Sequence, residues 1–322
     1  MPIALNVVEQ KDLKNKQRYS EGYRLVGNHS AVKICEYCKK AITGKDVCYK
    51  NTFYGIESWR CVQMSPTFFC DHRCVFCWRD IEYVWPKWQG PVDDPKDIVE
   101  GCIKAHIELL QGFKGNSEAI AEKVKEMGKP LHFAISLTGE PTMYPKLPEM
   151  IDFIKEKGMT AFLVTNGTIP FMVEKLIAHQ PTQLYISVYG PNKEIYQKTA
   201  NPISKDAWEK LHKSLSIMHK FKRNVVRLTL VKNYNFVDPE GYARLIEKYK
   251  PMFVECKGFS FIGHAQERLQ VHNMPYNDEV LEFAKKIQQN SSYKLIDSKK
   301  ESRVALLARD DFKDRKMNFE GL

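Results

Sequence analysis

Short runs of β-branched and aromatic residues alternate with amphipathic stretches from about residue 61 onward. Strands that alternate with helical stretches of roughly 10–15 residues predict an α/β fold of βα units around a parallel sheet. About six such units are too few for a closed eight-stranded barrel, which leaves an open, partial barrel or a doubly wound sheet. In both architectures the reactive groups lie at the carboxyl ends of the strands. The predicted strands are 61–68, 131–137, 160–165, 183–189, 225–231 and 253–262, the predicted helices are 97–110, 146–157, 170–179, 205–220, 239–249 and 277–289, and a final strand pair is predicted at 294–297 and 303–309.

The segments on either side of this alternating region differ from it. Residues 1–60 are polar and irregular, so we predict an N-terminal extension there, a barrel over 61–290 and a C-terminal extension over 291–322. No uncharged apolar run is long enough to cross a bilayer, and the N-terminus becomes charged too early for a secretory signal peptide. We therefore expect a cytoplasmic protein without a membrane partner. A chain of 322 residues buries enough surface to fold alone, so we also expect a monomer.

Charge and cysteine content narrow the class of protein further. Lys and Arg total 49 against 39 Asp and Glu, which gives a net charge of +10. Such a surplus suits a polyanionic partner, although many basic enzymes bind no nucleic acid. Seven of the nine cysteines lie between residues 35 and 77. An odd number of reduced cysteines in a cytoplasmic chain favours metal ligation or catalysis over disulfides.

Three cysteines form a C-x3-C-x2-C loop directly after the first predicted strand, at Cys70, Cys74 and Cys77. Three thiolates on one short loop can hold three irons of a [4Fe–4S] cluster and leave the fourth iron open to a substrate. His72 lies in the same loop and keeps a structural zinc site open as an alternative, because three cysteines and one histidine also suit Zn²⁺.

A second trio lies upstream, where twelve residues separate Cys35 from Cys48 and Cys48 from Cys61. Three more thiols predict a second [4Fe–4S] cluster, again with one open iron. The alternative is three unrelated thiols. Cys38 is an additional cysteine, and three interpretations stay open: it is a spare thiol, it competes with Cys35 as a ligand, or it forms half of a zinc site with Cys35.

The cysteine loop, with the aromatic Phe76 just before its last cysteine, resembles the signature of the radical S-adenosylmethionine (SAM) superfamily. The resemblance implies an open six-unit βα barrel and a cluster whose open iron chelates the amino and carboxylate groups of SAM. Reductive cleavage of SAM then yields a 5′-deoxyadenosyl radical that abstracts a substrate hydrogen. Thr138, Gly139 and Glu140 resemble the superfamily's Gly-Gly-Glu-Pro motif, with Thr138 in place of the first glycine. Gly139 allows close backbone approach and Glu140 provides an acceptor for an ammonium group.

Further polar residues end the third and fourth predicted strands. Thr165, Asn166 and Ser187 resemble positions near the methionine or ribose part of SAM. The alternative is an ordinary turn and a strand-end hydroxyl, since these residue types are common there.

Longer stretches narrow the resemblance to the archaeal-type tRNA 4-demethylwyosine synthase family. They run from about residue 25 to about residue 270 and include 29–35, 47–50, 60–66, 77–79, 136–142 and 255–258. The family implies a carbon–carbon lyase that condenses N1-methylguanosine at position 37 of phenylalanine tRNA with two carbons of pyruvate. A radical on the N-methyl group adds to the carbonyl carbon of pyruvate, the carboxylate is lost, and cyclisation closes the tricyclic base. Methionine and 5′-deoxyadenosine are released.

Lys50 matches the family lysine that is proposed to form a Schiff base with pyruvate. Burial beside Cys48 would lower its pKa and free the amine for attack on a carbonyl. Two alternatives stay open, namely that pyruvate chelates the open iron of the second cluster, or that Lys50 is one more solvated lysine.

The cofactors and partners implied are two [4Fe–4S] clusters, SAM, pyruvate and the N1-methylguanosine-bearing tRNA. The eukaryotic-type relatives carry an N-terminal flavodoxin domain for which this chain has no room, so we expect a separate flavodoxin- or ferredoxin-like electron donor. Two other functions compete with this interpretation. One is a radical-SAM enzyme with an auxiliary cluster and a non-tRNA substrate, and the other is a zinc-stabilised RNA-binding module without enzymatic activity.

Overall fold

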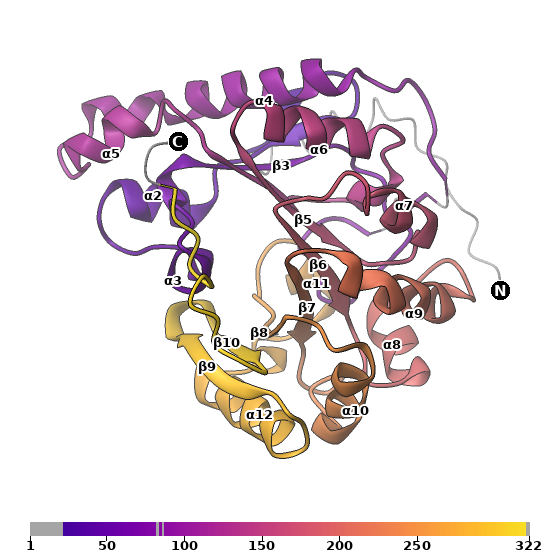
Figure 1. Cartoon of the computed structure of the whole chain (residues 1–322). Helices are drawn as coiled ribbons and strands as arrows, with labels where there is room; N and C mark the ends of the chain where they lie inside the picture. The colour runs from indigo at the N-terminus through magenta and orange to yellow at the C-terminus, as the bar shows by residue number, and fades with distance from the viewer. Residues whose placement is uncertain (1–21, 82–83, 86, 320–322) are drawn as a thin grey trace.

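The structure is a computed structural model and describes residues 22–81, 84–85 and 87–319 of the chain. Its centre is a ten-stranded sheet with the order β1-β2-β3-β4-β5-β6-β7-β8-β10-β9 (Figure 1). The strands are β1 Arg24–Val26, β2 Ser30–Val32, β3 Cys61–Ser65, β4 His132–Ile135, β5 Thr160–Thr165, β6 Gln183–Val188, β7 Asn224–Leu230, β8 Phe253–Gly258, β9 Lys294–Lys299 and β10 Val304–Ala308.

The middle of the sheet consists of six parallel strands, β3 to β8, in chain order. All six strands predicted by the alternating pattern are therefore present, and helices connect them. The helices are α2 Glu36–Ile42, α3 Tyr49–Tyr54, α4 Pro95–Leu110, α5 Ala121–Glu126, α6 Leu147–Glu156, α7 Pro170–Lys175, α8 Lys193–Ala200, α9 Ala207–Ile217, α10 Pro239–Tyr249, α11 Ala265–Arg268 and α12 Asn277–Gln289. None of the described helices is long and apolar enough to span a bilayer.

One face of the sheet packs against α4, α6, α7, α9, α10 and α12 and forms the larger hydrophobic core (Figure 1). Successive side chains of a strand point to opposite faces, so every second residue of each strand enters this core. In β7, for example, Val226, Leu228 and Leu230 belong to it.

Local signals fix where the helices begin. Asp94 caps α4 by accepting a hydrogen bond from the Lys96 amide, and Pro95 occupies the first helical position.

The opposite face of the sheet, called the inner face below, is covered by α3. Phe162, Tyr185, Val225 and Phe253 of four neighbouring strands pack there against α3 and β10. The same alternation places Arg227 of β7 and Glu255 of β8 on this face, because they are paired in register and lie two residues from Val225 and Phe253. The inner face therefore carries charged side chains within an aromatic environment.

The prediction that residues 1–60 are irregular was wrong for the described part, residues 22–60. The strands β1 and β2 extend the sheet antiparallel to β3. Two short helices follow, and their apolar side chains, among them Ile42 and Phe53, are fully buried. Elements of six or seven residues carry too little periodicity to be recognised, and tertiary packing stabilises them. The predicted C-terminal strand pair is confirmed, since β10 pairs with both β8 and β9.

Candidate active site

The three-cysteine loop leaves the carboxyl end of β3 and precedes α4. Cys70 and Cys74 are buried, and Cys77 is partly exposed. Burial raises the pKa of the Cys70 thiol to about 12, while the Arg79 guanidinium lowers it. Burial also raises the pKa of Cys74, and the neighbouring Cys77 and Cys70 thiols raise it further. The three cysteines also line one cavity, which makes their sulfurs available to a single metal centre.

The turn after β4 brings Glu140 against the cysteine loop. Gly139 adopts φ +65°, and a side chain there would collide with the carbonyl oxygens of Thr67 and Phe69. Its neighbour Glu140 donates its backbone N–H to the Phe69 carbonyl at 2.6 Å. Only glycine fits this close approach of the turn to the backbone of the cysteine loop. The predicted contact of Gly139 with SAM stays a prediction.

The Glu140 carboxylate is buried and receives four hydrogen bonds. Oε1 accepts from the Thr142 amide at 3.0 Å and from the hydroxyls of Thr142 and Thr165, both at 2.6 Å. Oε2 accepts from the Asn166 amide at 2.7 Å. Burial raises the pKa of Glu140, although these hydrogen bonds oppose the shift. A carboxylate offers about four lone-pair positions, so Oε2 can still accept a hydrogen bond from a ligand.

A second polar network fixes the start of the cysteine loop. Asp71 accepts hydrogen bonds from the Asn166 amide nitrogen Nδ2 and the Thr168 hydroxyl, both at 2.7 Å. His72 pairs with Asp71 through Nδ1 at 2.7 Å and with the Tyr196 hydroxyl through Nε2 at 2.8 Å. Both ring nitrogens of His72 are therefore in use. His72 therefore has no ring nitrogen left to bind zinc. A ring nitrogen of His72, the Cys70 sulfur and an Asp71 carboxylate oxygen nevertheless lie within 4.8 Å of one another.

The cysteines of the loop, Glu140 and Asn166 line one cavity of about 210 Å³ at the carboxyl ends of β3 to β6. The Thr138 hydroxyl is buried there and has no hydrogen-bond partner among the described residues. A polar atom left unpaired in a cavity wall suits a polar ligand. Sequence reasoning had not singled out Tyr189, whose ring packs 5.2 Å from that of Phe76. The structure brings all the predicted cofactor-binding residues to this cavity, namely Phe76, Thr138, Gly139, Glu140, Thr165, Asn166 and Ser187.

Two arginines hold the far side of the loop and were also missed. Arg79 is buried and donates to the His72 carbonyl at 3.2 Å. Burial opposes its charge, but the neighbouring Cys70 and Cys77 thiols raise the pKa of Arg79. Arg268 donates to the carbonyls of Val75 and Cys77. A single sequence gives no signal for the Arg268 contacts, because they join segments almost two hundred residues apart.

The second cysteine trio is also assembled. Cys35 precedes α2, Cys48 precedes α3, and Cys61 begins β3. Burial raises the pKa of Cys48 to about 11, and the Cys35 thiol raises it further. The pKa of Cys61 is raised to about 12, chiefly by burial. The Lys50 ammonium opposes this shift, and the Cys48 and Cys35 thiols add to it. The three thiols therefore lie close to one another and to Lys50, in a place separate from the cavity described above.

Lys50 is buried in α3 beneath this trio, with 7% of its surface exposed. Its ammonium nitrogen lies 4.9 Å from the ring centre of Tyr185 and 5.4 Å from that of Phe162. Burial lowers the pKa of Lys50 and the Arg227 guanidinium adds to the shift, whereas the Cys48 and Cys61 thiols oppose it. The alternative of a solvated Lys50 is therefore wrong.

Cys38 lies beside the trio but belongs to a hydrophobic cluster with Ile42, Leu110 and Met127. Burial raises the pKa of its thiol, and the thiols of Cys61 and Cys35 raise it further. Its Sγ lies 3.9 Å from the Trp59 carbonyl oxygen. Cys38 is thus a buried neighbour of the trio that packs as an apolar residue.

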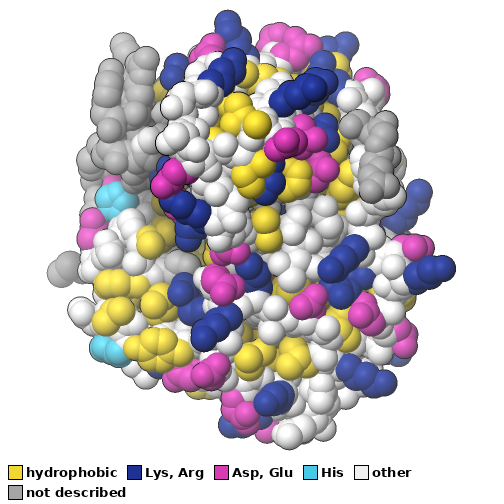
Figure 2. Space-filling model, turned by 90° about the vertical axis from the view of Figure 1, so that its left-hand side faces the viewer, with side chains coloured by type: hydrophobic (Ala, Val, Ile, Leu, Met, Phe, Trp, Pro, Cys, Tyr) yellow, Lys and Arg dark blue, Asp and Glu magenta, His cyan; other side chains and the backbone are white. Residues whose placement is uncertain are grey.

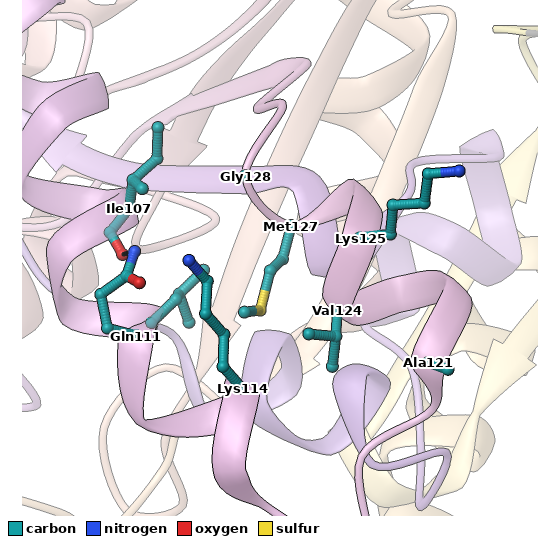
Figure 3. A pocket seen from close by; sticks show the side chains of 9 residues that line it. Ile107, Gln111, Lys114, Ala121, Val124, Lys125, Met127 and Gly128 are labelled. Carbon is teal, nitrogen blue, oxygen red and sulfur yellow. Dashed lines mark hydrogen bonds between the residues drawn. The ribbon is translucent and has the colours of Figure 1, made fainter.

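A larger hollow of about 370 Å³ lies elsewhere, between the end of α4 and α5. Val124 and Met127 point into it, whereas Lys125 extends away (Figure 3). None of the residues that line this hollow is a thiol, a carboxylate or a predicted site residue. Its size therefore does not make it the reactive centre, and the smaller cavity beside the cysteine loop is the better candidate.

Comparisons with known proteins agree with this geometry. A family model described as "Radical SAM superfamily" matches residues 64–246, which include the cysteine loop and the strands around the cavity. A second model, described as "Wyosine base formation", matches residues 248–309. The first model covers more than half of the chain, which is therefore a radical SAM protein.

Close relatives narrow the assignment. A Pyrococcus horikoshii protein named S-adenosyl-L-methionine-dependent tRNA 4-demethylwyosine synthase is 43% identical, over 97% of this chain and 92% of that protein. A Methanocaldococcus jannaschii protein of the same name is 38% identical, over 94% and 96%. The chain belongs to the tRNA 4-demethylwyosine synthase family. A mouse member with TYW1 in its name is 38% identical, but the match covers only 37% of its length.

Solved structures support the same family. One described as "Structure of TYW1 with a lysine-pyruvate adduct bound" has a TM-score of 0.83 and 36% identity, and covers 97% of this chain and 99% of that chain. "Crystal structure of archaeal TYW1" has a TM-score of 0.76 and 34% identity, with the same coverage. A radical SAM methyltransferase from Sphaerobacter thermophilus, with a TM-score of 0.51 and 13% identity over 81% of this chain and 66% of that chain, shares the fold alone.

The cavity fits the cofactors that this family uses, SAM and a [4Fe–4S] cluster. Thiols of one loop provide three soft ligands, as such clusters require. The unpaired Thr138 hydroxyl and the remaining lone pair of the Glu140 carboxylate offer polar contacts to an amino acid ligand.

Proposed function

We propose that the chain condenses N1-methylguanosine at position 37 of phenylalanine tRNA with two carbons of pyruvate, and that it forms the tricyclic wyosine precursor on an open six-unit βα barrel spanning residues 61–290. Residues 1–60 and 291–322 are extensions of this barrel in the proposal. The observation that carries it is the pairing of a SAM-type cavity with a separate thiol trio beside a buried lysine. Membership of the tRNA 4-demethylwyosine synthase family supports the substrate class.

The residues of the cavity bind SAM in this proposal. When bound and reduced, the cluster held by Cys70, Cys74 and Cys77 supplies the electron that cleaves SAM. Glu140 accepts the SAM ammonium through Oε2, because its other lone pairs are occupied. Hydroxyls and amides of Thr138, Thr165, Asn166 and Ser187 offer hydrogen bonds to the methionine and ribose parts, and Phe76 packs against the loop.

Cys35, Cys48 and Cys61 hold a second [4Fe–4S] cluster in the proposal, and Lys50 forms the bond to pyruvate. The neutral amine of Lys50 attacks the carbonyl carbon, and the carbonyl oxygen leaves as water. Burial favours this step, since it lowers the pKa of Lys50 and increases the fraction of neutral amine. The solved relative described with a lysine–pyruvate adduct supports Lys50 over chelation of pyruvate by the open iron.

The tRNA must present its modified base as an unstacked nucleotide, because a radical formed in a cavity at the strand ends cannot reach a base stacked within the anticodon loop. On the face seen in Figure 2, Lys and Arg side chains alternate with Asp and Glu, so this face has no continuous basic stripe. We infer a monomeric, cytoplasmic enzyme that receives electrons from a separate flavodoxin- or ferredoxin-like donor.

Iron counting tests the two-cluster part of the proposal. Anaerobically reconstituted protein should contain about eight irons per chain, and a triple Ala variant of Cys35, Cys48 and Cys61 about four. A separate assay follows the tRNA. The Lys50→Ala variant should lose the tricyclic product and keep reductive SAM cleavage. A chain that leaves N1-methylguanosine tRNA unchanged in the presence of SAM, reductant and pyruvate would refute the proposed reaction.

A further inference from the structure

A group of buried and partly buried charges lies on the inner face beside Lys50 and takes no part in the proposed reaction. Arg227 of β7 is paired in register with Glu255 of β8, and Lys257 lies two residues further along β8 on the same face. Aromatic rings join these charges to Lys50. The Arg227 guanidinium lies 4.6 Å from the ring centre of Tyr185, and the Lys257 ammonium lies 5.3 Å from that of Tyr49.

Positive charges outnumber negative ones in this group. Its carboxylate, Glu255, is fully buried and already accepts hydrogen bonds from Arg227 at 3.0 Å and from the Tyr54 hydroxyl at 2.8 Å. Neither Lys50 nor Lys257 has a carboxylate within ion-pair distance among the residues that the structure describes. The Lys257 ammonium donates a hydrogen bond to the Ser302 carbonyl, at 2.9 Å. Lys50 is buried and Lys257 is partly buried, and cations that are withdrawn from solvent without a carboxylate partner suit an anionic ligand.

Two further observations connect Lys257 with the Lys50 site. Burial lowers the pKa of Lys257 to about 8, the Arg227 guanidinium adds to this, and the Cys48 thiol opposes it. Lys257 and Lys50 are therefore both within electrostatic reach of Cys48. Lys257 also lies in the segment matched by the "Wyosine base formation" model, whereas the segment matched by the radical SAM model ends at residue 246.

We propose that Lys257 binds the carboxylate of the α-keto acid whose carbonyl carbon reacts with Lys50. This inference rests on the proposed function. In the bond-forming step the neutral Lys50 amine adds to the carbonyl carbon, both of its N–H hydrogens leave with the carbonyl oxygen as water, and a proton from solvent can then bind the imine nitrogen. The carboxylate remains ionised throughout and needs a fixed cation. Arg227 is the other candidate, but Glu255 already neutralises its guanidinium.

Trapping of the imine tests this role without any turnover. Anaerobic, cluster-loaded protein is incubated with a series of pyruvate concentrations and reduced with borohydride. Intact mass measures the trapped fraction, and peptide mass spectrometry locates the modified lysine. Hydroxyacetone is the matched neutral ketone, because it has a similar size and no carboxylate. The variants are Lys257→Gln, Lys257→Arg and, as a control, Lys285→Gln, which removes a charge from the exposed side of α12.

The unmodified protein should trap pyruvate on Lys50 at far lower concentration than it traps hydroxyacetone. Lys257→Gln should raise the half-trapping concentration of pyruvate roughly 10- to 100-fold, as loss of one charge-assisted hydrogen bond requires, and should not move that of hydroxyacetone. Lys257→Arg should restore most of the preference for pyruvate over hydroxyacetone, and Lys285→Gln should leave the half-trapping concentrations of both ketones unchanged.

The unfavourable outcomes are distinct from one another. Equal shifts for both ketones would mean that Lys257 only supports the structure, and no shift for either would mean that another group, such as the open iron, binds the carboxylate. Attachment of pyruvate to Lys257 itself would also overturn the inference. Absence of any trapping in the unmodified protein would refute the Lys50 adduct of the proposed function, and this inference with it.

Discussion

The sharpest prediction concerns Gly139, where the backbone of the Glu140 turn meets the cysteine loop. A methyl group added at this position would overlap the Thr67 carbonyl oxygen and lie 2.7 Å from the Phe69 carbonyl oxygen. Neither oxygen can move freely, since Thr67 O accepts from the Ser65 hydroxyl and Phe69 O accepts from the Glu140 amide. The Gly139→Ala variant must therefore shift the segment that leads directly into the cysteine loop.

Gly158 provides a matched control. It has φ +72° against +65° for Gly139, and an added methyl group there meets nothing within 4 Å. Both Ala variants carry the same left-handed backbone cost of roughly 1–2 kcal/mol. Only Gly139→Ala adds the steric overlap, which costs about 1–3 kcal/mol in a packed interior. The free energy of unfolding should thus fall by about 2–5 kcal/mol for Gly139→Ala.

Urea unfolding of both variants, followed by circular dichroism, measures the difference. Iron content after reconstitution gives the functional readout, and it should fall in Gly139→Ala while Gly158→Ala resembles the unmodified protein. Equal unfolding free energies for the two variants would show that the segment from Thr67 to Phe69 yields at no cost, and the steric argument would then be wrong.

Three further predictions concern buried polar groups. Glu140→Gln should weaken SAM binding at least tenfold in anaerobic equilibrium dialysis, because an amide cannot accept from the Asn166 amide and from a ligand ammonium as the carboxylate does; unchanged affinity would exclude Glu140 as the acceptor. Burial lowers the pKa of His106 to about 4. As the pH falls below about 6.5, this histidine is therefore protonated in the unfolded chain but stays neutral in the native chain. Between pH 7 and 5 this difference in proton binding lowers the free energy of unfolding by about 2 kcal/mol. The His106→Phe variant should lose this pH dependence in urea titrations at the two pH values, and a variant as pH-dependent as the unmodified protein would contradict the prediction. Arg227→Met should destabilise the fold by about 3–5 kcal/mol, because it leaves the Glu255 carboxylate buried without its ion-pair partner. The double variant Arg227→Met/Glu255→Gln should regain most of the lost stability, as measured by thermal unfolding.

The short length of α2 and α3 explains why the N-terminal helices escaped prediction. In α2 and α3 the helical segments have seven and six residues, which is less than two turns. Their stability comes from tertiary contacts, such as those of Phe53 and Tyr54 with the inner face of the sheet. A hydrophobic period needs more residues than these helices have before it can be recognised.

The order of residues along the chain determined the parallel strands, the cysteine loop and the polar residues that follow each strand. These features depend on local patterns, since strand and helix periods, ligand spacing and turn residues are properties of neighbouring positions. Parallel strands then bring their carboxyl ends to one edge, which is why Glu140, Thr165 and Ser187 could be placed together in advance.

Only the tertiary structure decided which charges surround Lys50. Arg227, Glu255 and Lys257 come from strands about two hundred residues away from it, and their place on the inner face follows from strand register. Register and burial arise from the packing of the whole sheet, and burial is what turns ordinary lysines and thiols into groups with shifted pKa values. A reactive amine is therefore a property of the folded environment more than of the lysine itself.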